Sequence, residues 1–152
     1  MKRLVIMRHA KAEQFAETDF ARPLSERGHE QTRQCKKWLS KLNFEIDFAL
    51  VSSAKRTKQT WEDLGLSCDS ELTDRGYNAS AEQWVNLIRH SGLSCENLLV
   101  VGHNPGLTDL AFALGSDLEL GTCGAVVVEL DADWPEFGLV SATVSDAFSP
   151  IK

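Results

Sequence analysis

The chain has 152 residues and a formal net charge of −6. Its length suits one domain with one sizeable core, and we take residues 1–152 as a single domain. Hydrophobic residues make up 43% of the chain and charged residues 25%, as in an average soluble globular protein. The acidic balance argues against broad binding of nucleic acid or of an anionic membrane. No apolar stretch is long enough for a membrane span or a signal-peptide core, so we expect a cytoplasmic protein.

The four cysteines are widely scattered and show no metal-ligand spacing. They are Cys35, Cys68, Cys95 and Cys123. We therefore expect free thiols in a reducing compartment, with no disulfide framework, no structural metal and no cofactor.

Two predicted strands end in histidine. The apolar run 4–7 leads into Arg8 and His9, and the run 97–102 leads into His103. Ligands of open α/β sheets bind at the carboxyl ends of strands. Arg8 and His9 alone would also fit an ordinary strand whose polar exit residues face water. The second histidine shifts the balance, because Asn104 and Pro105 after it are typical of a helix N-cap and first turn, where anions bind.

A third cation is predicted near the same edge. A helix over 54–64, capped by Ser52 or Ser53, follows a predicted strand over 46–51. It places Arg56 in the first turn, where a cation opposes the helix dipole. A residue whose position is unfavourable for the helix that carries it is a candidate functional residue. The alternative is that Arg56 and its neighbouring lysines only solubilise the surface.

The remaining pattern alternates between strands and helices. A loop is expected over 11–22, a helix over 25–42 capped by Ser25, a strand over 67–72, a helix over 80–90 capped by Ser80, a helix from 104 to about 115, and antiparallel strands over 123–130 and 139–144. His90, at a helix C-terminus, is given a structural role. The pattern predicts an α/β fold, a three-layer α/β/α sandwich around a mostly parallel central sheet with an antiparallel edge portion.

Two arginines and two histidines meeting at one sheet edge indicate phosphate chemistry. Guanidinium groups match phosphoryl oxygens in shape and charge, and an uncharged imidazole can attack phosphorus. A second imidazole can stabilise charge on the other oxygens. The chain has no P-loop and no Gly-x-Gly-x-x-Gly motif, so nucleotide binding has no support.

Four segments resemble the motifs of the histidine phosphatase superfamily, in the family's order. Segment 7–10 is similar to its Arg-His-Gly signature, with Ala10 where glycine is usual. Segment 22–28 is similar to Arg-Pro-Leu-Thr-x-x-Gly, segment 51–60 to Ser-x-x-x-Arg-x-x-Gln-Thr, and segment 101–105 to Gly-His-Asn-Pro. The short length resembles the SixA-type branch, the phosphohistidine phosphatases.

The resemblance implies a role for each matching residue. His9 would be the nucleophile that becomes phosphorylated, and His103 the second histidine of the pocket. The residues that it implies for substrate binding are Arg8, Arg22, Arg56 and Asn104, with Arg22 at the pocket rim. The implied partner is a phosphorylated protein of histidine phosphotransfer or phosphocarrier type, hydrolysed by a monomeric enzyme without metal.

The general acid is where this sequence departs from longer members of the family. The region that carries their acid is short here, and the candidates are Glu71, Asp74 and Glu82. An alcohol leaving group benefits from a positioned acid, whereas an imidazole can depart already protonated. We therefore expect protein phosphohistidine as the substrate. The alternatives are a small-molecule phosphomonoesterase of the same superfamily and a phosphate-dependent binding module with little catalysis.

Overall fold

A six-stranded sheet forms the centre of the molecule in the computed structural model, which describes residues 1–138 and 141–151. The strand order is β3-β2-β4-β1-β5-β6. The strands are β1 (Lys2–Arg8), β2 (Phe48–Ser52), β3 (Asp69–Thr73), β4 (Asn97–Gly102), β5 (Ala125–Leu130) and β6 (Ala142–Phe148). Strands β3, β2, β4 and β1 run parallel to one another, β5 pairs antiparallel with β1, and β6 pairs antiparallel with β5. The predicted mixed sheet is confirmed; residues 139–140 of the last predicted strand lie outside the described residues.

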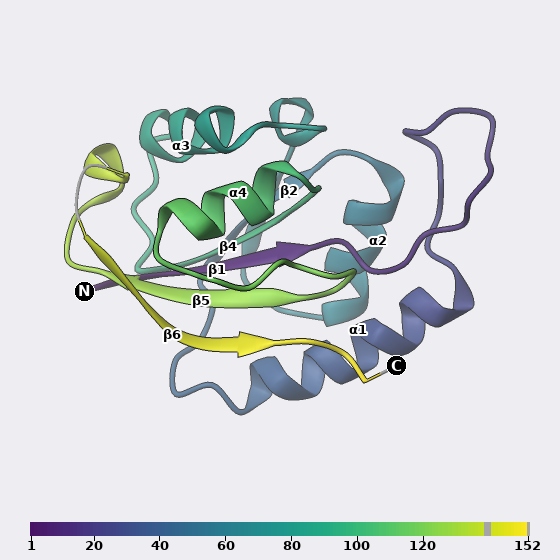
Figure 1. Ribbon diagram of the computed structural model, residues 1–152, viewed down its shortest axis with the longest axis horizontal. Coiled ribbons are helices and arrows are strands. Elements are labelled where there is room, and N and C mark those ends of the chain that lie inside the picture. The colour runs from purple at the N-terminus through teal and green to yellow at the C-terminus, as the bar shows by residue number, and fades with distance from the viewer. Residues whose placement is uncertain (139–140, 152) are drawn as a thin grey trace.

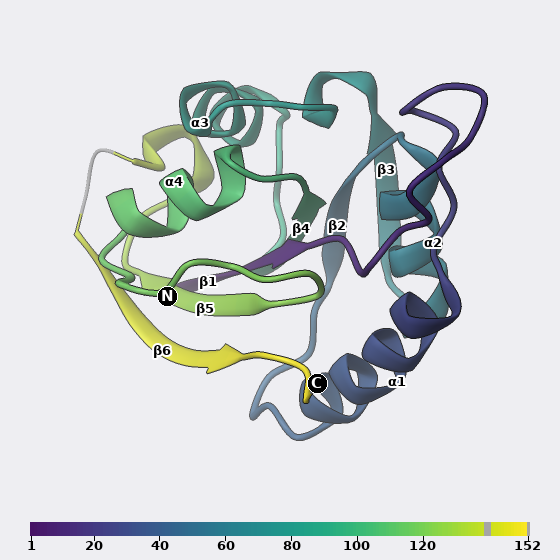
Figure 2. The ribbon, with the colours of Figure 1, turned by 45° about the vertical axis from the view of Figure 1, so that its right-hand side comes forward.

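Helices cover both faces of the sheet. They are α1 (Glu26–Ser40), α2 (Lys55–Leu64), α3 (Ala81–His90) and α4 (Gly106–Ala113), with short 3-10 turns η1 (Asp74–Gly76) and η2 (Trp134–Glu136). Helices α1 and α2 lie on one face and α3 and α4 on the other (Figure 1 and Figure 2). The predicted three-layer architecture is therefore confirmed.

Strand β1 explains why its sequence is a continuous apolar run. Leu4 and Ile6 point into the core beneath α3 and α4, while Val5 and Met7 point into the core beneath α1 and α2. All four side chains are fully buried. A central strand covered on both faces needs apolar residues at every position. The polar residues of β1 therefore lie at its two ends, Lys2 and Arg3 at the amino end and Arg8 at the carboxyl edge of the sheet.

The predicted helix caps are partly confirmed. The Ser25 hydroxyl accepts the Gly28 backbone N–H at 3.1 Å, and Ser80 forms a reciprocal capping box with Gln83. Helix α1 ends at Ser40, two residues before the predicted end.

Two other predicted caps are wrong. Ala54 stands at the N-cap of α2, because the hydroxyl of Ser52 contacts His103 and that of Ser53 donates to Asp74. Helix α4 begins at Gly106, one residue later than expected. Asn104 still accepts the Thr108 backbone N–H at 3.1 Å, so its side chain supports the helix from outside the N-cap.

All four cysteines are free, as predicted, and Cys35 and Cys123 are buried in the core. Within residues 1–138 and 141–151, no helix has the length and apolar character needed to cross a membrane.

Candidate active site

The two predicted site histidines lie side by side because β1 and β4 are parallel neighbours. Arg8 pairs with Gly102 in register, so His9 and His103 each follow directly after adjacent strands. The His9 backbone N–H donates to the Gly102 carbonyl at 3.0 Å. The ring centroids are 5.3 Å apart with an interplanar angle of 55°. The topology thus brings together two imidazoles that are 94 residues apart in sequence.

The His9 ring is oriented by its own main chain. Its Nδ1 lies 2.7 Å from the Ala10 carbonyl oxygen, which can only accept, so Nδ1 carries the hydrogen and Nε2 keeps a lone pair. The pKa of His9 is lowered from 6.5 to about 4, mainly by burial. The positive charges of Arg56 and Arg8 contribute to this decrease. His9 is therefore uncharged at neutral pH, as a nucleophile must be.

Alanine at position 10 fits this arrangement. Ala10 is fully buried, and its backbone N–H donates to the Thr60 hydroxyl at 3.0 Å. The non-glycine residues with positive φ in the described chain are Asn78 and Cys123, so the backbone at Ala10 does not require glycine.

His103 is also buried, with 3% of its surface exposed. Its Nε2 lies 2.8 Å from the Ser52 hydroxyl oxygen, and its Nδ1 is a buried atom without a hydrogen-bond partner. Burial lowers the pKa of His103 to about 3, with smaller contributions from the neighbouring His9 and Arg56. Both rings of the pair are thus uncharged at neutral pH.

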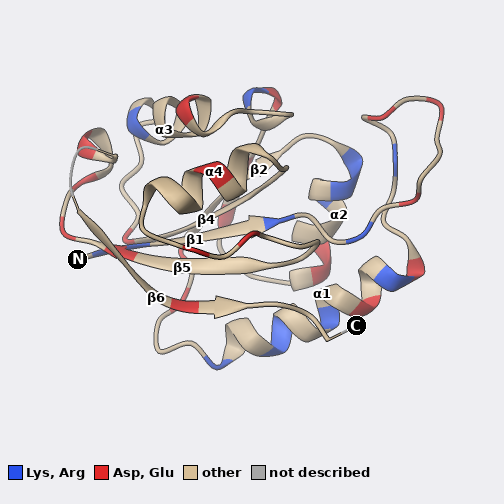
Figure 3. Ribbon diagram, in the orientation of Figure 1, with Lys and Arg blue, Asp and Glu red and all other residues tan. Residues whose placement is uncertain are grey.

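Arg56 is a buried residue of the site and does not serve to solubilise the surface. Only 4% of it is exposed, and its guanidinium donates to the Asp19 carbonyl at 2.8 Å and to the Asp19 carboxylate at 3.1 Å. Arg8 donates from Nη1 to the Leu120 carbonyl at 3.2 Å, while its Nε is buried without a partner. Burial lowers the pKa of Arg8. Figure 3 shows lysine and arginine positions in blue at the carboxyl end of β1 and on α2.

Asp19 is a residue of this site that the sequence patterns did not single out. Its carboxylate accepts from Arg22 at 3.0 Å, from Arg56 at 3.1 Å and from the Tyr77 hydroxyl at 2.5 Å. These donors, Tyr77 first, hold the pKa of Asp19 well below its usual range, and Asp19 in turn raises the pKa of Tyr77. Asp19 lies in a loop without periodicity; its position three residues before Arg22 was the available signal.

The two remaining predicted binding residues have structural contacts. Arg22 donates from Nε to the Glu13 carbonyl at 2.7 Å, besides its bond to Asp19, and thus joins the loop 11–22 to the site. The Asn104 side-chain amide donates to the Leu120 carbonyl at 2.7 Å, the same oxygen that Arg8 contacts. Substrate contacts of Arg22 and Asn104 stay predictions.

The three candidate acids are not in contact with the histidine pair. Asp74 accepts the Ser53 hydroxyl at 2.5 Å, Glu71 is exposed on edge strand β3, and Glu82 is exposed in the first turn of α3. In the described ranges, no hydrogen bond joins any of them to either histidine. The Asp19 carboxylate hydrogen-bonds to Arg22 and Arg56, and the charge of Glu119 acts on Arg8.

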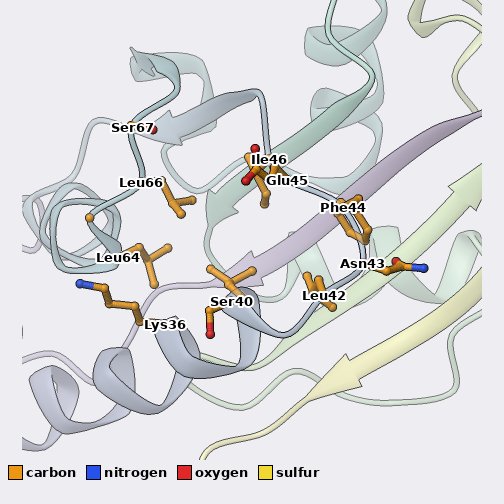
Figure 4. Close-up of a pocket in the computed structure, with 12 residues that line it drawn as sticks. Lys36, Ser40, Leu42, Asn43, Phe44, Glu45, Ile46, Leu64, Leu66 and Ser67 are labelled. Atoms are coloured by element: carbon orange, nitrogen blue, oxygen red, sulfur yellow. The ribbon is translucent and has the colours of Figure 1, made fainter.

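A separate hollow of about 670 Å³ lies at the opposite end of the sheet, where α1 and α2 end (Figure 4). Much of its lining is apolar, including Leu42, Phe44, Ile46 and Leu66, and it contains neither histidine nor arginine. It is unrelated to the cluster of Arg8, His9, Arg56 and His103.

An α/β fold with two neighbouring imidazoles and two arginines at its carboxyl edge, Arg56 buried and Arg8 partly buried, is typical of a phosphoryl-transfer site. Comparison with known proteins identifies the family. The model of the histidine phosphatase superfamily (branch 1) matches residues 4–76. An uncharacterised protein of Mycobacterium tuberculosis is 31% identical over 147 residues, which cover 96% of this chain and 92% of the relative. Phosphohistidine phosphatase SixA of Escherichia coli is 32% identical over 108 residues, or 66% of each chain.

Solved structures agree with this relationship. A candidate phosphohistidine phosphatase SixA from Nakamurella multipartitia has a TM-score of 0.92 at 23% identity, with 99% of this chain and 97% of that chain covered, which shows the shared fold. The protein histidine phosphatase SixA complexed with tungstate has a TM-score of 0.81 at 27% identity, with 97% of each chain covered. The chain belongs to the histidine phosphatase superfamily, and it resembles the SixA branch. It is accordingly a phosphatase.

Proposed function

We propose that this phosphatase hydrolyses phosphohistidine in proteins through a covalent intermediate on His9. The observation that carries the proposal is the pair of uncharged imidazoles, with ring centroids 5.3 Å apart, beside the buried Arg56 and the partly buried Arg8. His9 presents a lone pair on Nε2, because its Nδ1–H is bound to the Ala10 carbonyl. Arg8 and Arg56 would hold the phosphoryl oxygens.

Two transfers complete the reaction. The His9 Nε2 lone pair forms a bond to phosphorus while the phosphorus–nitrogen bond of the substrate breaks, and the substrate imidazole departs with its own ring proton. Water then attacks phosphorus, releases inorganic phosphate and restores His9. The guanidiniums stabilise the charge on the phosphoryl oxygens in both steps.

A site carboxylate that carries no proton favours phosphohistidine over alcohol phosphates as the substrate. The carboxylate that hydrogen-bonds to Arg56 is that of Asp19, whose pKa is held far below neutrality by Tyr77, Arg22 and Arg56, so it has no proton to give at neutral pH. An alcohol phosphate needs such a proton, whereas an imidazole leaving group brings its own. Similarity to phosphohistidine phosphatase SixA supports the same substrate class.

The test compares a protein phosphorylated on histidine with a sugar phosphate. We expect acid-labile phosphate on His9 during turnover of the phosphoprotein, and a kcat/KM at least about 100-fold lower for the sugar phosphate. His9→Ala should abolish both turnover and labelling, while the exposed His90→Ala serves as a matched control with full activity. Full turnover by His9→Ala would refute the mechanism, and similar kcat/KM on the two substrates would refute the substrate assignment.

A further inference from the structure

The contact between Ser52 and His103 follows from the register of two parallel strands. Val51 of β2 pairs with Val101 of β4, so Ser52 and His103 emerge together at the carboxyl edge. Ser52 is fully buried, and its hydroxyl oxygen lies 2.8 Å from His103 Nε2. None of the roles assigned above involves this serine.

The direction of the hydrogen bond can be worked out from the other partner of the hydroxyl. The Ala54 backbone N–H points at Ser52 Oγ at 3.5 Å and uses an acceptor position. In the described chain, the Ser52 hydroxyl has hydrogen bonds only to Ala54 and His103. If Nε2 carried the hydrogen, the buried serine proton would have no acceptor, which is costly. The hydroxyl therefore donates, and Nε2 accepts.

The other ring nitrogen of His103 must then carry the hydrogen. An uncharged imidazole has one N–H, so an accepting Nε2 leaves the hydrogen on Nδ1. That Nδ1 is buried and has no hydrogen-bond partner, in a ring whose centroid is 5.3 Å from that of His9. A phosphoryl oxygen bound at His9 is the acceptor that such a donor lacks.

We propose that Ser52 is a positioning residue that fixes uncharged His103 in its Nδ1–H form, ready to donate to a phosphoryl oxygen. This inference rests on the proposed function for its purpose. The donor is neutral and preoriented, so it stabilises developing charge on the oxygen without losing its proton in either transfer step. Serine at position 52 thus controls His103 rather than capping α2.

Nitrogen chemical shifts of ¹⁵N-labelled histidine report the tautomer without requiring turnover. At about pH 7 we expect His103 of the unaltered protein to be uncharged and protonated on Nδ1. Ser52→Ala should shift the population toward Nε2–H. The matched control is Ser53→Ala, which removes the neighbouring hydroxyl bound to Asp74 and should leave the tautomer unchanged. An Nε2–H or imidazolium form in the unaltered protein, or an unchanged tautomer in Ser52→Ala, would overturn the proposal.

Kinetics give a second, separable readout. Ser52→Ala should lower kcat about 10-fold to 100-fold with little change in KM, because the misplaced hydrogen matters most in the transition state. Phosphate should still accumulate on His9, only more slowly. A wild-type kcat in a folded Ser52→Ala protein would contradict the role of Ser52. Absence of phosphate on His9 in the unaltered enzyme would instead refute the proposed function and leave the tautomer result standing.

Discussion

Asp19 places a negative charge beside the arginine that is proposed to hold the phosphoryl group, Arg56. Its carboxylate contacts Arg22 and Arg56, the same cations that would meet a phosphoryl group. Arg56 has a second anchor, because its Nη1 donates to the backbone carbonyl of Asp19 at 2.8 Å. The side chain of Asp19 therefore tunes the charge of the site more than it fixes the position of Arg56.

Removing that charge should strengthen the binding of inorganic phosphate. We expect Asp19→Asn to lower the competitive inhibition constant of phosphate about threefold to tenfold, because the arginines lose a competing anion while Arg56 keeps its backbone anchor. The measurement is phosphate inhibition of turnover at low ionic strength. Glu17→Gln, on the same loop and exposed, removes an equal charge and should change the constant little. Weaker phosphate inhibition of Asp19→Asn would show that its carboxylate mainly orders the arginines.

Helix α1 and the loop after His9 approach most closely at Gly28. The Lys11 carbonyl lies over the first turn of α1 and accepts the backbone N–H of Ser25 at 2.9 Å. A Cβ atom at Gly28 would lie 2.1 Å from that oxygen, far inside contact distance. Glycine at the end of the segment 22–28 is thus explained by a close approach of two backbones.

Gly28→Ala should therefore destabilise the protein, although alanine normally favours a helix. Relief of glycine's entropy cost would add about 1 kcal/mol of stability, whereas forcing α1 away from Lys11 costs about 1–3 kcal/mol or more. We expect a net loss in urea unfolding and reduced turnover, because Lys11 is two residues from His9. Gly121→Ala, where a Cβ meets open space, is the matched control and should unfold like the unaltered protein. A more stable Gly28→Ala would contradict the close approach.

At the scale of the whole molecule, the sequence predicts those features of the fold that follow from the hydrophobic pattern and from strand direction. The run 4–7 is apolar throughout because β1 is buried on both faces, so its strand and its polar exit residues were evident. Parallel order then implied that His9 and His103 meet. Asp19 was missed because its contacts with Arg56 and Tyr77 are long-range, and the Ser52 cap was wrong because His103 uses that hydroxyl. Long-range polar contacts have no sequence period.

Burial of the two uncharged histidines should make the stability of the whole molecule depend on pH. In the unfolded chain both titrate near 6.5, whereas in the folded protein the pKa of His9 is about 4 and that of His103 about 3. Above 6.5 neither state binds these protons, so the histidines contribute no pH dependence. Below 6.5 the unfolded chain binds more protons, so the free energy of unfolding falls as pH falls.

This loss should be complete for His9 below about pH 4 and amount to about 3 kcal/mol from that residue. Urea unfolding at a series of pH values from about 7 to about 4 measures it. The pKa of Asp19 also lies below its unfolded value, but its contribution is lost only under more acidic conditions, so the window from 6.5 to 4 reports the histidines.

His9→Ala should flatten the dependence of the free energy of unfolding on pH in this window, and the exposed His90→Ala should keep it. Equal slopes for the unaltered protein and His9→Ala would mean that folding leaves the pKa of His9 near 6.5, which would contradict its lowering by burial.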